Sequence, residues 1–197
     1  MHRCDVCADA RRHYIRQFGK NMEISSVGTR GNADASPSQG PEMLARKKLR
    51  PLIVDNSPFM RELIRGILAS VGIGDVSVAR DGEHALHVLT TRDPTPNVLF
   101  VDWDMAPMDG LELTRQIRRS PMESRIKPFI PIIMVTAFAE FDRVITARDA
   151  GVHEFLVKPI TVGRVLSHLS RAVNEPRRFV WLGNYIGPAP RAPRAST

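Results

Sequence analysis

The chain has 197 residues, 43% of them hydrophobic and 25% charged, which is typical of a soluble globular protein with room for one ordinary domain and its extensions. The formal net charge of +7 is uneven, because residues 1–47 and 174–197 carry +3 each and residues 48–173 only +1, and this argues against a DNA-binding face on the central part. No apolar stretch approaches the roughly 18–20 residues of a membrane span, and the N-terminus lacks the apolar segment of a secretion signal, so we expect a cytoplasmic protein with no membrane partner.

Residues 1–47 are expected to form a disordered N-terminal extension. Residues 20–42 are rich in Ser, Gly, Asn, Asp and Pro and show no hydrophobic periodicity, so they cannot bury enough apolar surface to offset their ordering entropy. Cys4 and Cys7 form a CxxC motif, but a zinc site needs a second ligand pair and a redox motif needs a preceding strand. We interpret the two cysteines as ordinary thiols, with a metal site as the alternative.

Five short apolar runs follow in the central part of the chain. Each is rich in β-branched residues and apolar throughout, as expected of strands that are buried on both faces of a parallel sheet. These predicted strands are Pro51–Val54, Val76–Ala79, Val98–Val101, Ile132–Val135 and Phe155–Val157.

Amphipathic stretches separate these runs and predict helices. Ser57 and Pro58 are an N-cap and first-turn pair that opens a helix to about Ser70, and Gly72 and Gly151 stand where helix ends favour a left-handed residue. The apolar face of the first helix is Phe59, Leu63, Ile64, Ile67 and Leu68; the later helices are Asp81–Thr91, Leu111–Arg119, Phe141–Ala150 and Thr161–Val173. The alternation predicts a single α/β domain over residues 48–173, a doubly wound five-stranded parallel sheet with right-handed crossovers.

Polar side chains follow four of the predicted strands. Ligands of such sheets bind at the carboxyl ends of the strands, so these side chains are expected to converge on one edge. They are Asp55 and Asn56 after the first strand, Asp102 and Asp104 after the third, Thr136 after the fourth and Lys158 after the fifth. Clustered carboxylates favour a divalent cation with hard oxygen ligands, such as Mg²⁺. An Asp nucleophile with a metal, an ammonium and a hydroxyl beside it suits phosphoryl transfer.

Four stretches together resemble the receiver domain of bacterial response regulators, the CheY-like family. They are LIVD ending at Asp55, VDWDMAPMDGLEL at 101–113, MVTA at 134–137 and AGVHEFLVKPI at 150–160. The resemblance covers about residues 48–173, and its motifs occur in order at suitable separations. It implies a flavodoxin-like sheet with the strand order 2-1-3-4-5.

The resemblance also implies a role for each matching position. Asp102 corresponds to the phosphoacceptor, Thr136 to the hydroxyl switch, Lys158 to the lysine of the site and Phe155 to the rotating aromatic. The Lys158–Pro159 bond stands where the family has a cis peptide. The implied Mg²⁺ ligands are Asp55, Asn56, Asp102 and Asp104, the last through its main-chain carbonyl.

Asn56 departs from the family pattern, which usually has a second Asp there. A neutral amide oxygen still binds Mg²⁺, but one negative charge is lost and the affinity should fall. Asp104 is expected to supply a compensating carboxylate. Ala106 stands where a Pro is usual and Pro107 follows it, which we interpret as a shifted loop.

Three functions are compatible with this site. The favoured one is a signalling receiver, not an enzyme, that is phosphorylated by a histidine kinase or phosphotransfer protein and contacts a downstream protein target. We expect no DNA-binding or catalytic output domain, because few residues flank the predicted domain in this sequence. The alternatives are a pseudo-receiver that binds its partners without phosphorylation, favoured by Asn56, and a hydrolase, which lacks a second catalytic acid.

The C-terminal extension, residues 174–197, interleaves cations and aromatics. Its residues Arg177, Arg178, Phe179, Trp181 and Tyr185 would bind an acidic partner or a nucleotide through stacking and Arg–phosphate contacts, or the aromatics fold back on the domain. Trp103 is expected to form a partly exposed wall of the site. The histidines His84, His87, His153 and His168 are expected to be exposed residues of helices.

Overall fold

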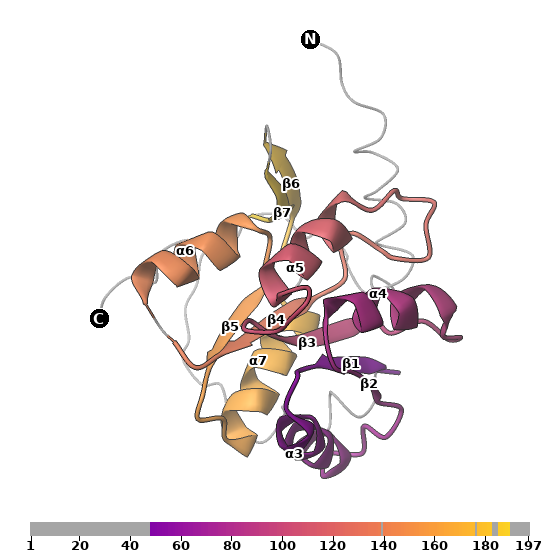
Figure 1. Ribbon diagram of the computed structural model, residues 1–197, viewed down its shortest axis with the longest axis vertical. Coiled ribbons are helices and arrows are strands. Elements are labelled where there is room, and N and C mark those ends of the chain that lie inside the picture. Colours follow the sequence, from indigo (N-terminus) through magenta and orange to yellow (C-terminus); the bar gives the residue numbers. More distant parts are fainter. Residues whose placement is uncertain (1–47, 139, 176, 183–184, 190–197) are drawn as a thin grey trace, which may run out of the picture. The chain divides into compact units, whose positions relative to one another are not determined.

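The computed structural model describes residues 48–189 except 139, 176, 183 and 184, and the predicted N-terminal extension with Cys4 and Cys7 lies outside these residues. A five-stranded parallel sheet forms the centre, in the order β2-β1-β3-β4-β5 (Figure 1). Its strands are β1 (Pro51–Val54), β2 (Ser77–Ala79), β3 (Val98–Asp102), β4 (Ile132–Thr136) and β5 (Glu154–Val157). The predicted sheet and its strand order are confirmed.

Five helices of the described residues cover the two faces of the sheet, because side chains alternate along each strand and both faces are apolar. They are α3 (Pro58–Ala69), α4 (Gly82–Thr91), α5 (Gly110–Arg119), α6 (Phe141–Asp149) and α7 (Val162–Asn174). None of the helices in the described part of the chain is long and apolar enough to span a membrane.

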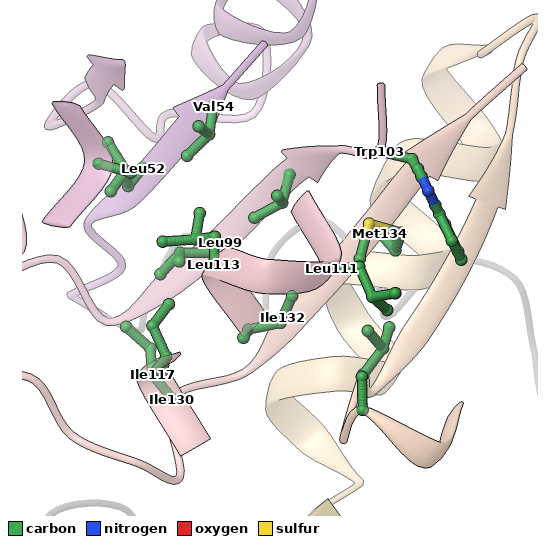
Figure 2. Packing of buried hydrophobic residues seen from close by; sticks show 14 of the residues in the cluster. Leu52, Val54, Leu99, Trp103, Leu111, Leu113, Ile117, Ile130, Ile132 and Met134 are labelled. Carbon is green, nitrogen blue, oxygen red and sulfur yellow. The ribbon is translucent and has the colours of Figure 1, made fainter. Parts of the chain in front are cut away.

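One face packs against α4, α5 and α6, and the other against α3 and α7. Leu52, Leu99 and Ile132 come from three neighbouring strands and meet Leu113 and Ile117 of α5 on the first face (Figure 2). The opposite face is built on the next residue of each strand; its members include Ile53, Phe100, Ile133, Ile64, Leu68, Val165 and Leu169. Burial of such side chains is worth about 1.5–3 kcal/mol each before the entropy of ordering is counted.

Local signals in the sequence set the helix ends. Ser57 accepts a hydrogen bond from the Met60 N–H, as its predicted N-cap role requires. Asp81, Asp109 and Thr161 cap α4, α5 and α7 in the same way. Gly72 and Gly151 have φ angles of +80° and +95°, so the expected left-handed positions are confirmed.

Four side chains outside the predicted site differ from the sequence-based expectation. Phe59 and Leu63 are 73% and 36% exposed, because they lie at the edge of the apolar stripe of α3, whose buried residues begin at Ile64. His153 precedes β5 and accepts a hydrogen bond from the Ile132 N–H at 3.2 Å. His168 belongs to α7, but it is half-buried beside the Glu154 carboxylate.

The part of the C-terminal extension that the structure describes contains an antiparallel hairpin of β6 (Phe179–Leu182) and β7 (Tyr185–Pro188). The ring of Phe179 packs edge-on against Phe129 with 4.8 Å between centroids, and Arg177 donates to the His153 carbonyl at 3.1 Å. The extension therefore folds back on the domain at Phe179, which was one of the two expectations.

Candidate functional site

Four predicted side chains meet at the carboxyl edge of the sheet. Asp102 ends β3, Thr136 ends the neighbouring β4, and Asp55 and Lys158 directly follow β1 and β5. Lys158 Nζ lies 2.8 Å from Asp102 Oδ1 and 3.3 Å from Asp55 Oδ2. Parallel strands deliver these groups to one place from positions up to 103 residues apart in the chain.

Both carboxylates are almost fully buried. Asp55 is 1% and Asp102 4% exposed. Burial raises the pKa of Asp102, and the charges of Asp55 and Asp104 raise it further, while the hydrogen bond and charge of Lys158 act in the opposite direction without cancelling the effect of burial. One ammonium therefore compensates two buried carboxylates only in part, and the site favours an additional cation.

Lys158 is the charged partner of this pair of acids. Burial alone lowers the pKa of its ammonium, but the hydrogen bond to Asp102 and the charges of Asp102 and Asp55 outweigh burial, and the pKa is raised. Lys158 is consequently protonated at neutral pH. The Lys158–Pro159 peptide bond is cis, in agreement with the sequence-based expectation.

Asp55 is held by the start of α3. Its Oδ1 accepts the Ser57 N–H at 2.8 Å, and Arg61 donates to its main-chain oxygen at 2.6 Å. The second carboxylate oxygen is the one that faces Lys158. These contacts fix the side chain in one orientation, because each Asp55 oxygen has a separate donor.

A close approach brings α5 to Asp102. A Cβ on Gly110 would lie 2.2 Å from the main-chain oxygen of Asp102, so this position requires glycine. The Gly110 N–H also donates to the Trp103 carbonyl at 3.1 Å. The loop that follows β3 is thereby folded back tightly over the strand end.

Thr136 is fully buried, and its hydroxyl accepts the Phe138 N–H at 3.2 Å. In the strand register, Asp102 of β3 lies opposite Val135 of β4, and Thr136 of β4 lies opposite Val157 of β5. Thr136 therefore stands between the strands that lead to Asp102 and Lys158. A hydroxyl here has a proton to donate toward the same edge.

Residues 52–170 match the response regulator receiver domain family. The chain belongs to this family. The chemotaxis protein CheY1 of Helicobacter pylori is 41% identical over 113 residues, which are 57% of this chain and 87% of CheY1. A CheY homologue of Campylobacter jejuni is 40% identical and is covered to 83% of its length, again by 57% of this chain.

Solved structures agree with these sequence relatives. The chemotaxis protein CheY4 of Vibrio cholerae aligns with a TM-score of 0.56 and 28% identity, over 63% of this chain and 98% of CheY4. A CheX–CheY–BeF₃–Mg²⁺ complex from Borrelia burgdorferi aligns with a TM-score of 0.54 and 26% identity, over 61% of this chain and 86% of the matched chain. The chain is therefore a receiver of the two-component and chemotaxis type.

The receiver's Asn56 and Asp104 are in direct contact. Asn56 Nδ2 donates to the Asp104 main-chain oxygen at 3.1 Å, which is the oxygen that the resemblance assigns to the metal. The Asp104 carboxylate has a partner on α6. It lies 3.3 Å from Arg143 Nη1 and is half exposed, so its charge is partly balanced by α6.

Arg143 is a residue of this site that the sequence did not reveal. Its guanidinium lies 5.1 Å from the centroid of the Trp103 ring and 4.8 Å from that of Phe138, and it pairs with Asp104 at the same time. Trp103 is 8% exposed, so the expectation of a partly exposed wall is wrong. Phe155 is half-buried and meets Trp103 edge-on at 6.4 Å.

The donor set of the receiver consists of oxygens. Two buried carboxylates, Asp55 and Asp102, lie beside the Asn56 amide and the Asp104 main-chain oxygen. Among the residues that the structure describes, no three acidic, histidine or cysteine side chains form a metal-binding group. Hard oxygen donors fit Mg²⁺, and the neutral Asn56 amide brings one negative charge fewer to the set than a carboxylate would.

Proposed function

We propose that this receiver accepts a phosphoryl group on Asp102 and signals through contacts with other proteins. The observation that carries the proposal is the contact of Lys158 Nζ with Asp102 Oδ1 at 2.8 Å, beside the Asp55 carboxylate. A carboxylate so placed has a cation ready for the charge that phosphorylation adds.

The proposed reaction is a displacement at phosphorus. An Asp102 carboxylate oxygen attacks the phosphorus of the donor, a new O–P bond forms, and the bond to the leaving group breaks with its electron pair. Lys158 neutralises an oxygen of the transferred group, and the Thr136 hydroxyl donates to another. Mg²⁺, held by Asp55, Asp102, the Asp104 carbonyl and the Asn56 amide oxygen, would supply further charge neutralisation.

The chemistry of the site also constrains the donor. A histidine kinase or phosphotransfer protein fits a site that supplies its own nucleophile and cation. The leaving group of its phosphohistidine is imidazole. Bacterial receivers of this family receive phosphoryl groups from such proteins, and a small acyl phosphate offers the same chemistry in the test tube.

Output is proposed to pass through the face around β4, β5 and α6. Phe138, Phe141 and Val144 are 49%, 77% and 37% exposed there, and exposed apolar side chains that gather in one region mark protein interaction sites. Arg143 joins this face to the site, since it contacts both Phe138 and Asp104.

Intact-mass spectrometry tests the proposal. The full chain is incubated with acetyl phosphate and Mg²⁺, and a parallel sample contains EDTA in place of the metal. We expect a gain of one phosphoryl group that requires Mg²⁺ and is absent in Asp102→Asn. Absence of any gain at high Mg²⁺ would refute phosphorylation of the native chain.

A second candidate is the pseudo-receiver, a binding module that works without phosphorylation. The observation that favours it is the hydrogen bond from Asn56 Nδ2 to the Asp104 main-chain oxygen, because a metal would have to displace it. If the native chain takes no phosphoryl group and Asn56→Asp does, the pseudo-receiver is the correct assignment.

A further inference from the structure

A cavity of about 230 Å³ is lined by residues of the C-terminal halves of α5 and α6 and of strand β7 of the hairpin. α5 begins at Gly110 beside Asp102, whereas the cavity uses residues five to nine positions further on, about 8–13 Å along the helix axis. The cavity is thus separate from the carboxyl edge of the sheet. Its lining residues are Arg115, Arg118, Arg119, Thr146, Asp149, Ala150 and Ile186.

Two arginines of the lining carry uncompensated charge. Arg115 and Arg119 stand one helical turn apart, where like charges repel. Within the described part of the chain, neither makes an ion pair or a hydrogen bond. Glu112, the acidic residue of α5, contacts Gln116 instead, and Asp149 is paired with Arg148 at 2.8 Å.

Arg118 builds the floor of the cavity. It is 3% exposed, and its guanidinium donates to the main-chain oxygens of Gly151, Pro128 and Ile130 at 2.7–3.0 Å. It also lies 5.2 Å from the centroid of the Phe179 ring. These contacts fix Arg118, so Arg115 and Arg119, which are exposed, are the lining arginines available to a ligand.

The C-terminal hairpin forms part of the cavity wall. A Cβ on Gly151 would lie 2.6 Å from the Ile186 main-chain oxygen and 3.0 Å from Arg118 Nε, so β7 lies in backbone contact with the end of α6. Gly151 is required here both by this contact and by its positive φ of +95°. Strand β7 therefore contributes one wall of the cavity through Ile186.

We infer that this cavity binds the phosphate group of a small phosphorylated molecule. A phosphomonoester carries a charge of about −1.5 to −2 at pH 7, which matches two arginines, and guanidinium forks bind phosphate oxygens in pairs. The volume is below the roughly 300–1,000 Å³ of sites that enclose whole small molecules, so the group enters and the remainder stays outside. The inference does not depend on phosphorylation of Asp102.

The ends of α5 and α6 set the expected strength of binding. Both helices direct their carbonyl ends toward the cavity, and this end of a helix disfavours anions. The arginines must offset that effect, so we expect micromolar to millimolar affinity rather than tight binding. Basic residues in the last turn of α5 also have a simpler role, stabilising the helix end, and the experiment separates the two.

NMR titration of the ¹⁵N-labelled full chain tests the inference, with inorganic phosphate, ADP and adenosine as probes in EDTA. We expect saturable shifts with phosphate and ADP at the amides of Arg119, Ala150, Gly151 and Ile186, and none with adenosine. Arg115→Gln/Arg119→Gln should weaken ADP binding at least about tenfold. The control Arg65→Gln/Arg125→Gln removes the same charge from exposed pairs elsewhere and should bind as the native chain does.

Three results would overturn the inference. They are no shifts with any phosphate probe, equal binding by the Arg115/Arg119 variant, and shifts confined to the carboxyl edge near Lys158. Acetyl phosphate labelling of the same variant reports on the proposed function separately, because Arg115 and Arg119 lie outside that site and labelling should be unchanged.

Discussion

Lys158 Nζ lies 2.8 Å from Asp102 Oδ1 and 3.3 Å from Asp55 Oδ2, so one partly exposed ammonium bridges two buried carboxylates. The three residues come from different strand ends, and only the parallel sheet brings them together. Their charges do not balance, since burial keeps the pKa of Asp102 raised even with Lys158 in contact.

Lys158→Met should lower the free energy of unfolding by about 2–3 kcal/mol. Removal of one partner from a buried ion pair costs about 3–5 kcal/mol, and the 24% exposure of the Lys158 side chain reduces the loss. Urea denaturation with and without Mg²⁺ measures it. Mg²⁺ should stabilise the variant more than the native chain, because two carboxylates are then without their ammonium. Equal stabilisation by Mg²⁺ would contradict this account.

Asp102→Asn should gain stability relative to the native chain as the pH rises from 4 to 7. The folded-state pKa of Asp102 is raised mainly by burial, so its protonated form is favoured on folding, and that contribution is lost as the pH rises through the folded pKa. The variant cannot ionise at this position, so its stability does not fall in this way as the pH rises. Denaturation series at several pH values measure the difference. If the native chain instead gained stability relative to the variant between pH 4 and 7, Lys158 and not burial would set the pKa of Asp102.

Asn56→Asp should tighten Mg²⁺ binding at least about tenfold, because the variant would add a third carboxylate to the proposed ligand set. Asp104→Asn should weaken binding by a smaller factor, since the Asp104 carboxylate is already paired with Arg143. Trp103 fluorescence or isothermal titration gives the affinities. Thr90→Asp, which adds a carboxylate at an exposed position of α4, is the charge-matched control and should change little. A larger effect at Asp104 than at Asn56 would mean that the Asp104 carboxylate does turn to the metal.

Phe179→Ala should destabilise the domain by about 1–3 kcal/mol. The half-buried ring packs against Phe129 and Arg118, and truncation removes an aromatic pair together with apolar contact area. Thermal and urea denaturation report the loss. The neighbouring Arg178→Ala changes an exposed residue and should stay within about 0.5 kcal/mol of the native chain. If both variants are neutral, the hairpin does not contribute to the stability of the domain.

Much of the fold could be predicted from local patterns. Apolar runs gave the strands, and the cap at Ser57 and the glycine at 151 fixed helix ends within a residue or two. The convergence of Asp102 and Lys158 followed because parallel strands share one carboxyl edge. Each of these features is encoded by a pattern that spans only a few neighbouring residues.

Other features depend on packing that short segments do not encode. Arg143 reaches Trp103 and Asp104 only because of how α6 is rotated, and α6 has no side-chain cap and one buried residue, Ala147. The hairpin does have a sequence signal, because two short apolar runs separated by a Gly-Asn pair are typical of paired strands. The cavity beside Ile186 depends both on the placement of α6 and on the docked hairpin.

Chemical mapping of the phosphorylated residue tests the central claim most directly. Borohydride reduces an aspartyl phosphate to homoserine with release of phosphate, and peptide mass spectrometry locates the product. After treatment with acetyl phosphate and Mg²⁺, we predict homoserine at position 102 and at no other carboxylate of the chain. Homoserine at position 55 or 104, or none at any position, would contradict the assignment of Asp102 as the phosphoacceptor.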